Sequence, residues 1–207
     1  MQINNKIKAV IWDMGGVIMK TEDSLPRENL AKRLGISRLA LEDLIYGSES
    51  GRQAENGTIT DDEHWNFVAA SLGLSREEIG KVKTEFWAGD RIDQKIVNFI
   101  RSLRPSFLTG LLSNAWLSTR AEITKYFDFL DIFDVVIFSA EVGMSKPDPS
   151  IYQLITEKLG ISASEAVFMD DLYQNIKVAQ KLGMNTIHFK DTDETLSQLN
   201  TLLGIPE

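Results

Sequence analysis

The sequence contains no cysteine and only two histidines, His64 and His188. The lack of cysteine excludes disulfides, thiolate metal sites and cysteine nucleophiles. With so few histidines, multi-histidine zinc sites, histidine nucleophiles and most serine triads are hard to build. A chain without cysteine is typical of a reducing compartment, so we expect a cytoplasmic location. Any catalysis must therefore rely on carboxylates.

Long hydrophobic runs are also missing. No apolar stretch reaches membrane-spanning length, and the apolar run near the start is broken by Asp13, so neither a membrane span nor a signal peptide is expected. Lysine and arginine number 22 against 30 acidic residues, for a net charge of −8. Such a surface repels nucleic acid, so the expected partner is a small molecule. No feature of the sequence indicates an oligomeric state.

Short apolar runs recur along the chain, and each is typical of a buried strand. They are residues 9–12, 107–112, 135–138, 166–169 and 186–189. Helix-start signals lie between the later runs, at Thr119 with Glu122 and at Asp148 before Pro149, and Gly183 is expected to end the helix after Asp171. Strands alternating with helices predict the α/β class, with a doubly wound, Rossmann-like parallel sheet.

The stretch 21–90 differs because it has no strand-like run. Two capping boxes lie within it, Thr60 with Glu63 and Ser75 with Glu78. We therefore expect an all-helical cap domain at 21–90, with a polar loop at 47–57. Residues 1–20 and 91–207 are expected to form the core domain.

Polar residues follow each predicted strand at the edge where doubly wound sheets bind ligands. They are Asp13, Gly15 and Gly16, then Ser113 and Asn114, then Lys146 and Pro147, and finally Asp170 and Asp171. Three carboxylates and one lysine at one edge would repel one another unless a cation lay among them. Because all the candidate ligands are oxygen atoms, the sequence favours Mg²⁺ over zinc.

These residue types suit phosphoryl transfer. A metal ion neutralises charge on the transferring group while a carboxylate attacks phosphorus in line. Lys146 and Ser113 are expected to hold the phosphate oxygens. Gly15 and Gly16 would let the backbone turn and approach the ligand closely, where a side chain would obstruct it.

The segments WDMGGV, LLSNA, GMSKPDPSIY and FMDD, in that order, resemble the four signature motifs of the haloacid dehalogenase superfamily. The resemblance spans nearly the whole chain and implies a type 1 cap at the helical insertion. The form of the first motif is similar to that of glucose-1-phosphatases and epoxide hydrolase amino-terminal domains. The resemblance implies a role for each site residue. Asp13 is the nucleophile and a metal ligand, Gly15 offers its carbonyl to Mg²⁺, and Asp170 and Asp171 complete the metal site. Ser113 and Asn114 bind phosphate, and Lys146 bridges nucleophile and phosphate.

Gly15 departs from the family pattern. Most phosphatases of the superfamily have an aspartate at this position, which protonates the leaving group. A general acid typically contributes about 10²- to 10⁴-fold. The sequence therefore predicts a slow enzyme, one that prefers good leaving groups such as glycosyl phosphates, or one that takes its acid from elsewhere. Glu55 and His64 in the cap are the first candidates for that acid.

Two residues near the motifs have two interpretations each. Trp116, three residues past Ser113, either packs in the core or contacts substrate. Asn175, one turn into the helix after Asp171, either supports the metal ligands or lies exposed on the helix. Both histidines are expected to be structural.

Three functions remain open at this point. The first is a magnesium-dependent phosphatase that hydrolyses a small phosphorylated metabolite, such as a sugar phosphate, through an aspartyl-phosphate on Asp13. The second is a 2-haloacid dehalogenase, which needs no general acid but has no use for a metal-binding carboxylate pair. The third is a binding or regulatory protein that has lost turnover, which the retention of Asp13, Lys146 and both late aspartates argues against.

Overall fold

A five-stranded parallel sheet forms the centre of the computed structural model, which describes residues 7–205. The strand order is β5-β4-β1-β6-β7. The strands are β1 (Ala9–Trp12), β4 (Leu108–Ser113), β5 (Val135–Phe138), β6 (Ala166–Asp170) and β7 (Asn185–His188). The predicted doubly wound α/β fold is therefore confirmed, and each strand lies within one residue of its predicted position. The ends of the predicted core domain, residues 1–6 and 206–207, lie outside the described residues.

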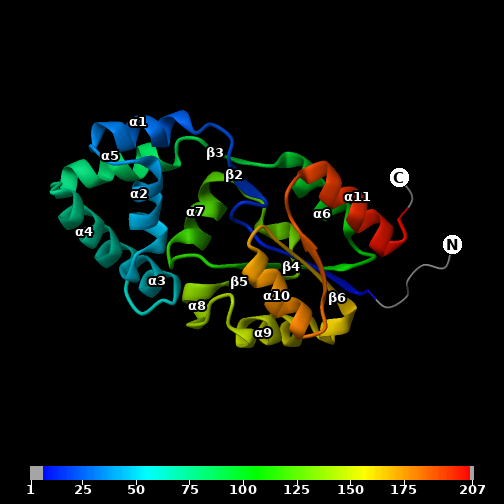
Figure 1. Cartoon of the computed structure of the whole chain (residues 1–207). Coiled ribbons are helices and arrows are strands. Elements are labelled where there is room, and N and C mark those ends of the chain that lie inside the picture. The colour runs from blue at the N-terminus through cyan, green and yellow to red at the C-terminus, as the bar shows by residue number, and fades with distance from the viewer. Residues whose placement is uncertain (1–6, 206–207) are drawn as a thin grey trace.

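Helices cover both faces of this sheet (Figure 1). One face packs against α6 (Gln94–Leu103), α7 (Thr119–Tyr126) and α11 (Thr192–Leu203), and the other against α9 (Pro149–Leu159) and α10 (Tyr173–Lys181). Short helices α8 (Ser139–Val142), η2 (Leu130–Ile132) and η3 (Ala163–Glu165) complete the connections. Val10 and Trp12 pack on the first face, whereas Ala9 and Ile11 pack on the second. Because both faces of β1 are buried, the strand is a continuous apolar run.

The helix-start signals are mostly where the sequence placed them. Asp148 caps α9, accepting a hydrogen bond from the Ser150 N–H at 2.8 Å, and Pro149 is the first helical residue. The residue before α7 is Ser118, not Thr119, so this prediction was wrong by one residue. The Ser118 hydroxyl donates to Glu122 Oε1 at 3.0 Å, one turn later.

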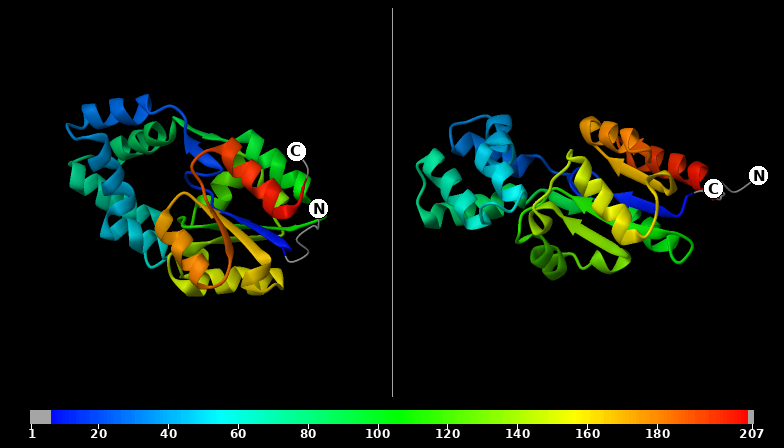
Figure 2. Two further views of the ribbon diagram at one scale, coloured as in Figure 1. Left: turned by 45° about the vertical axis from the view of Figure 1, so that its right-hand side comes forward. Right: turned by 90° about the horizontal axis from the view of Figure 1, so that it is seen from below.

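A helical insertion lies at one end of the sheet (Figure 2). Its elements are α1 (Leu25–Arg33), α2 (Arg38–Glu42), the π-helix η1 (Asp43–Gly47), α3 (Glu49–Glu55), α4 (Asp61–Leu72) and α5 (Arg76–Trp87). Both predicted capping boxes are present, at the starts of α4 and α5. The insertion has its own cluster of buried apolar side chains. Trp116, which lies in the core part of the chain, also belongs to this cluster.

The insertion begins and ends at a two-stranded antiparallel sheet of β2 (Met19–Thr21) and β3 (Asp90–Ile92). The sequence did not reveal these strands, because three residues are too few to show a period. Their position supports the predicted division into a core and a cap domain, which stays a prediction. No helix in the stretch 7–205 has both the length and the apolar character needed to cross a membrane.

The predicted polar loop at 47–57 was wrong, because most of this stretch is helix α3. Ser48 caps that helix by accepting a hydrogen bond from the Gly51 N–H at 3.0 Å. Gly51 is required by packing, since a Cβ there would lie 2.7 Å from the carbonyl oxygen of Ile45. A glycine selected for close packing was thus mistaken for a loop residue.

Candidate active site

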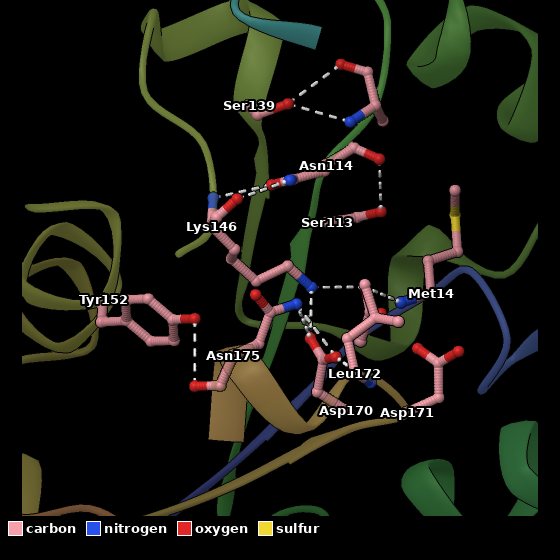
Figure 3. Close-up of polar contacts among 12 residues, drawn as sticks. Met14, Ser113, Asn114, Ser139, Lys146, Tyr152, Asp170, Asp171, Leu172 and Asn175 are labelled. Atoms are coloured by element: carbon pink, nitrogen blue, oxygen red, sulfur yellow. Dashed lines mark hydrogen bonds and ion pairs between the residues drawn. The ribbon is translucent and has the colours of Figure 1, made fainter. Parts of the chain in front are cut away.

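Three charged side chains meet at the carboxyl edge of the sheet (Figure 3). Asp13 follows β1, Asp170 ends β6, and Lys146 lies between α8 and α9. The Lys146 ammonium is 2.7 Å from Asp13 Oδ1 and 2.7 Å from Asp170 Oδ2. All three side chains are buried. Adjacent parallel strands bring the two carboxylates together, because the Asp13 N–H donates to the carbonyl of Met169 at 2.9 Å.

Asp171 adds a third, half-buried carboxylate. Asp13, Asp170 and Asp171 each offer an oxygen atom, and these atoms lie within 4.8 Å of one another. One ammonium group neutralises only one of the three negative charges. The residues therefore fit a divalent cation, and a set made of oxygen atoms alone fits Mg²⁺.

The pKa values of these groups reflect the crowding of like charges. Burial raises the pKa of the Asp13 carboxyl, Lys146 opposes that rise, and the neighbouring carboxylates reinforce it. Burial and the charge of Asp170 likewise raise the pKa of Asp171. Burial alone would lower the pKa of Lys146, but the charges of Asp13 and Asp170 outweigh it and raise the pKa. The lysine is therefore held as a cation between the two carboxylates.

Asp170 differs from Asp171 in its hydrogen bonds. Besides Lys146, Asp170 accepts bonds from the Leu172 N–H at 2.8 Å and from Asn175 Nδ2 at 3.0 Å to each oxygen. Asn175 is buried, so of its two interpretations the supporting role fits and the exposed one does not. Asp171, labelled beside Asp170 in Figure 3, is only half-buried, and the hydrogen bond that acts on its carboxylate comes from its own backbone. Asp171 is thus the freer of the two for a metal ion.

The Asn114 side chain is bound to the backbone of Lys146, and the phosphate contact expected of this residue stays a prediction. Its Nδ2 donates to the Lys146 carbonyl at 2.8 Å, and its Oδ1 accepts from the Lys146 N–H at 2.8 Å. The amide group is therefore occupied in fixing the backbone of the lysine. Ser113 ends β4 at the same edge, and its hydroxyl reaches only the Asn114 carbonyl, at a long 3.4 Å. Of the two, the Ser113 side chain is the better placed for phosphate.

The two glycines of the first motif have different roles. Gly16 has a φ of +74°, and a Cβ there would collide with the Asp171 carboxylate. A Cβ at Gly15 would meet nothing within 4 Å. Within the protein itself, Gly16 therefore has no room for a side chain and Gly15 has. That a side chain at either position would obstruct the ligand stays a prediction.

Several residues that support this edge had no sequence signal. Ser139, at the start of α8, accepts a hydrogen bond from the Ala115 N–H at 2.9 Å and donates to the Glu55 carbonyl at 2.6 Å. His188, expected to be structural, contacts the Asp171 carbonyl through Nε2 at 2.9 Å. These contacts join segments far apart in the chain, so no local pattern could have indicated them.

Trp116 packs rather than facing open space. Its ring lies 4.9 Å from the ring of His64 and 5.7 Å from that of Trp65, measured between centroids. Nearby, Asp61 accepts hydrogen bonds from the N–H groups of Leu117 and Ser118 at 3.1 and 3.2 Å. Trp116 and the turn after it therefore bind the core to the helical insertion.

Two known proteins are similar to this chain over almost its whole length. The chain is 28% identical to a sesquiterpene phosphatase of Aspergillus oryzae over 198 residues, covering 95% of this chain and 97% of that enzyme. It is 28% identical to bifunctional epoxide hydrolase 2 of Sus scrofa over 225 residues, which is 96% of this chain but 39% of that enzyme. The similarity to epoxide hydrolase 2 agrees with the branch of the superfamily that the form of the first motif indicated.

A solved structure with the same fold is that of a HAD family enzyme from Bacteroides thetaiotaomicron, determined in complex with magnesium and inorganic phosphate. It superposes with a TM-score of 0.77 at 27% identity, covering 92% of this chain and 98% of the other. The family model of haloacid dehalogenase-like hydrolases matches residues 7–183. With the motif order and the parallel sheet, this match means that the chain belongs to the haloacid dehalogenase-like hydrolase family.

Proposed function

We propose that this protein is a magnesium-dependent phosphatase that removes phosphate from a small phosphomonoester through an aspartyl-phosphate on Asp13. The observation that carries the proposal is Lys146, held 2.7 Å from both Asp13 and Asp170 with the third carboxylate of Asp171 alongside. Such a cluster suits a metal ion and a phosphate. A dehalogenase, which attacks carbon, has no need of the extra carboxylates.

The residues that would hold the metal are the side chains of Asp13 and Asp171 and the carbonyl of Gly15. When bound, Mg²⁺ neutralises charge on the phosphoryl group. Asp170, whose oxygens are occupied, acts chiefly by holding Lys146. The insertion at 21–90 is proposed to cover the site as a cap, and a cytoplasmic location remains the expectation from the sequence.

The chain's own groups perform the remaining steps. The Met14 N–H donates to Asp13 Oδ1 at 2.7 Å and, with Lys146, fixes the carboxylate for attack on phosphorus. The attack forms a bond between Asp13 and phosphorus and breaks the bond to the leaving oxygen. Lys146 and the Ser113 hydroxyl bind the phosphate oxygens. Water then attacks phosphorus and releases inorganic phosphate and free Asp13.

The proposal is tested by assaying purified protein against a panel of phosphorylated metabolites, with Mg²⁺ and with excess chelator. We expect phosphate release with Mg²⁺ and none with chelator, restored when Mg²⁺ is added back. A parallel assay of 2-haloacids is expected to show no halide release. Halide release that persists in chelator, without phosphate release, would establish the dehalogenase instead.

The two late aspartates should respond differently to Mg²⁺. We expect Asp171→Asn to raise the Mg²⁺ concentration for half-maximal activity by more than about 10-fold. Mutation of a residue that only hydrogen-bonds to a metal ligand already lowers metal affinity by about that factor, and Asp171 is proposed as a ligand itself. High Mg²⁺ should largely restore its rate. Asp170→Asn should lose rate that Mg²⁺ does not restore, because Lys146 loses its partner. Mg²⁺ titrations of both variants measure this, and the reverse pattern would exchange the two roles.

A further inference from the structure

The proposed chemistry lacks a proton donor for the leaving group. The position two residues after Asp13 is Gly15, which has no side chain. In an in-line displacement the leaving oxygen lies on the side of phosphorus opposite the nucleophile. Asp13 attacks from the edge of the sheet, so the leaving oxygen faces the helical insertion. The proton donor for the leaving oxygen is therefore expected on the insertion.

Glu55 ends helix α3, which lies beside α8 (Figure 1). Its carbonyl accepts the 2.6 Å hydrogen bond from Ser139, whose hydroxyl also accepts from the Ala115 N–H. One serine thus ties Glu55 to the residue that follows Asn114. Gly57 packs so closely on the Ala140 carbonyl that a Cβ would collide with it. The end of α3 is therefore fixed next to the phosphate-binding edge.

The Glu55 side chain, on the last residue of α3, is half-buried. Burial raises the pKa of the Glu55 carboxyl to about 7, although Lys146 and Arg52 both lower it. The charged group that α8 contributes, Glu141, is bound by Arg120 at 2.7 Å. Glu55 can therefore carry a proton near neutral pH, unlike an ordinary surface glutamate.

His64, the other candidate for this role, is excluded by its surroundings. Its side chain is fully buried and its Nδ1 is bonded to Ser50 Oγ at 3.0 Å. The ring packs against Trp116, and burial lowers its pKa, which favours the neutral form. His64 is therefore a packing residue whose Nε2 is buried.

We propose that Glu55 is the general acid that this enzyme uses in place of the missing aspartate, a role that rests on the proposed phosphatase function. As Asp13 bonds to phosphorus, the electron pair of the broken bond goes to the leaving oxygen, and the Glu55 carboxyl gives that oxygen its proton. The Glu55 carboxylate then takes a proton from the water that attacks the aspartyl-phosphate. The cycle converts a phosphomonoester and water into an alcohol and inorganic phosphate, with Glu55 protonated again.

The test compares Glu55→Gln with wild type in single-turnover reactions of 4-nitrophenyl phosphate and of a simple alkyl phosphate. The first has an acidic leaving group that departs without a proton, and the second does not. We expect Glu55→Gln to lose about 10²- to 10⁴-fold on the alkyl phosphate and less than about 10-fold on the aryl phosphate. Glu49→Gln, on the exposed side of the same helix, is the matched control and should match wild type on both.

The pH profile gives a readout that a structural role would not move. The acid must be protonated, so the wild-type rate on the alkyl phosphate should fall as the pH rises through about 7, the value to which burial raises the pKa of Glu55. That falling limb should be absent in Glu55→Gln. Gly15→Asp, whose side chain has open space, should restore the alkyl rate in the Glu55→Gln background.

Two results would overturn the role of Glu55: equal rate losses on both substrates, or no loss on either. The melting temperature of each variant is measured first, and Glu55→Ala repeats the comparison if Glu55→Gln is poorly folded. Both results leave the phosphatase proposal intact, since wild type still releases phosphate. A wild-type protein that releases phosphate from neither of these substrates, nor from any member of the metabolite panel, would instead contradict the proposed function itself.

Discussion

Asp13→Asn should reduce phosphate release by at least about 10⁴-fold, the scale on which loss of a covalent nucleophile acts. Asparagine keeps the size of the side chain and can still accept the Met14 N–H bond, but its amide cannot form the acyl-phosphate. The change therefore removes the nucleophile and leaves the shape of the site. Steady-state phosphate release at saturating substrate and Mg²⁺ measures the loss.

A matched control for this variant is Asp191→Asn. Asp191 caps α11 through hydrogen bonds from the Asp193 and Glu194 N–H groups, and asparagine is an equally good cap. The control should keep both stability and rate. An Asp13→Asn protein that is as active as this control would assign the nucleophile to another residue.

The second large effect is expected from Lys146→Met, which keeps an unbranched side chain but removes the charge. Phosphate release should fall by at least about 10³-fold, because the lysine both orients Asp13 and binds phosphate. The folded state should also lose about 3–5 kcal/mol in chelator, since two buried carboxylates lose their partner. Activity assays and urea unfolding measure the two effects.

The loss of stability expected in Lys146→Met should depend on pH in one direction. Lys146→Met removes the positive charge that opposes the rise that burial causes in the pKa of Asp13. The folded variant then holds a proton that the unfolded chain releases, so its free energy of unfolding increases as the pH falls. Lys20→Met, which breaks the part-buried pair with Asp93, is the control and should leave the rate unchanged. A Lys146→Met protein whose stability does not depend on pH in this way would contradict the geometry.

The sheet was predictable from the sequence because its strands are buried on both faces. Residues of β1 alternate between two apolar clusters, so burial requires a continuous apolar run, which a sequence shows directly. The polar residues at the strand ends were also predictable. Because parallel strands bring their carboxyl ends to one edge, the order of the strand-like runs was enough to place Asp13, Asp170 and Asp171 together.

The supporting contacts could not be predicted, because they depend on three-dimensional proximity. The Asn114 side chain holds the backbone of Lys146, which lies 32 residues later, and no local pattern indicated that contact. Ser139 meets Glu55 across 84 residues of sequence. Strands β2 and β3 pair across the whole insertion and are too short for a pattern. The insertion's own helices were visible mainly through their capping boxes.

The measurement that tests the central claim most directly is acid quenching of a single turnover, followed by mass spectrometry of the peptide that contains Asp13. Wild-type protein with Mg²⁺ and substrate should carry one phosphoryl group on that peptide, at Asp13, early in the reaction. Asp13→Asn should carry none. Phosphate release at the normal rate by wild type, with no phosphoryl group trapped on Asp13 at any time before completion, would contradict the account.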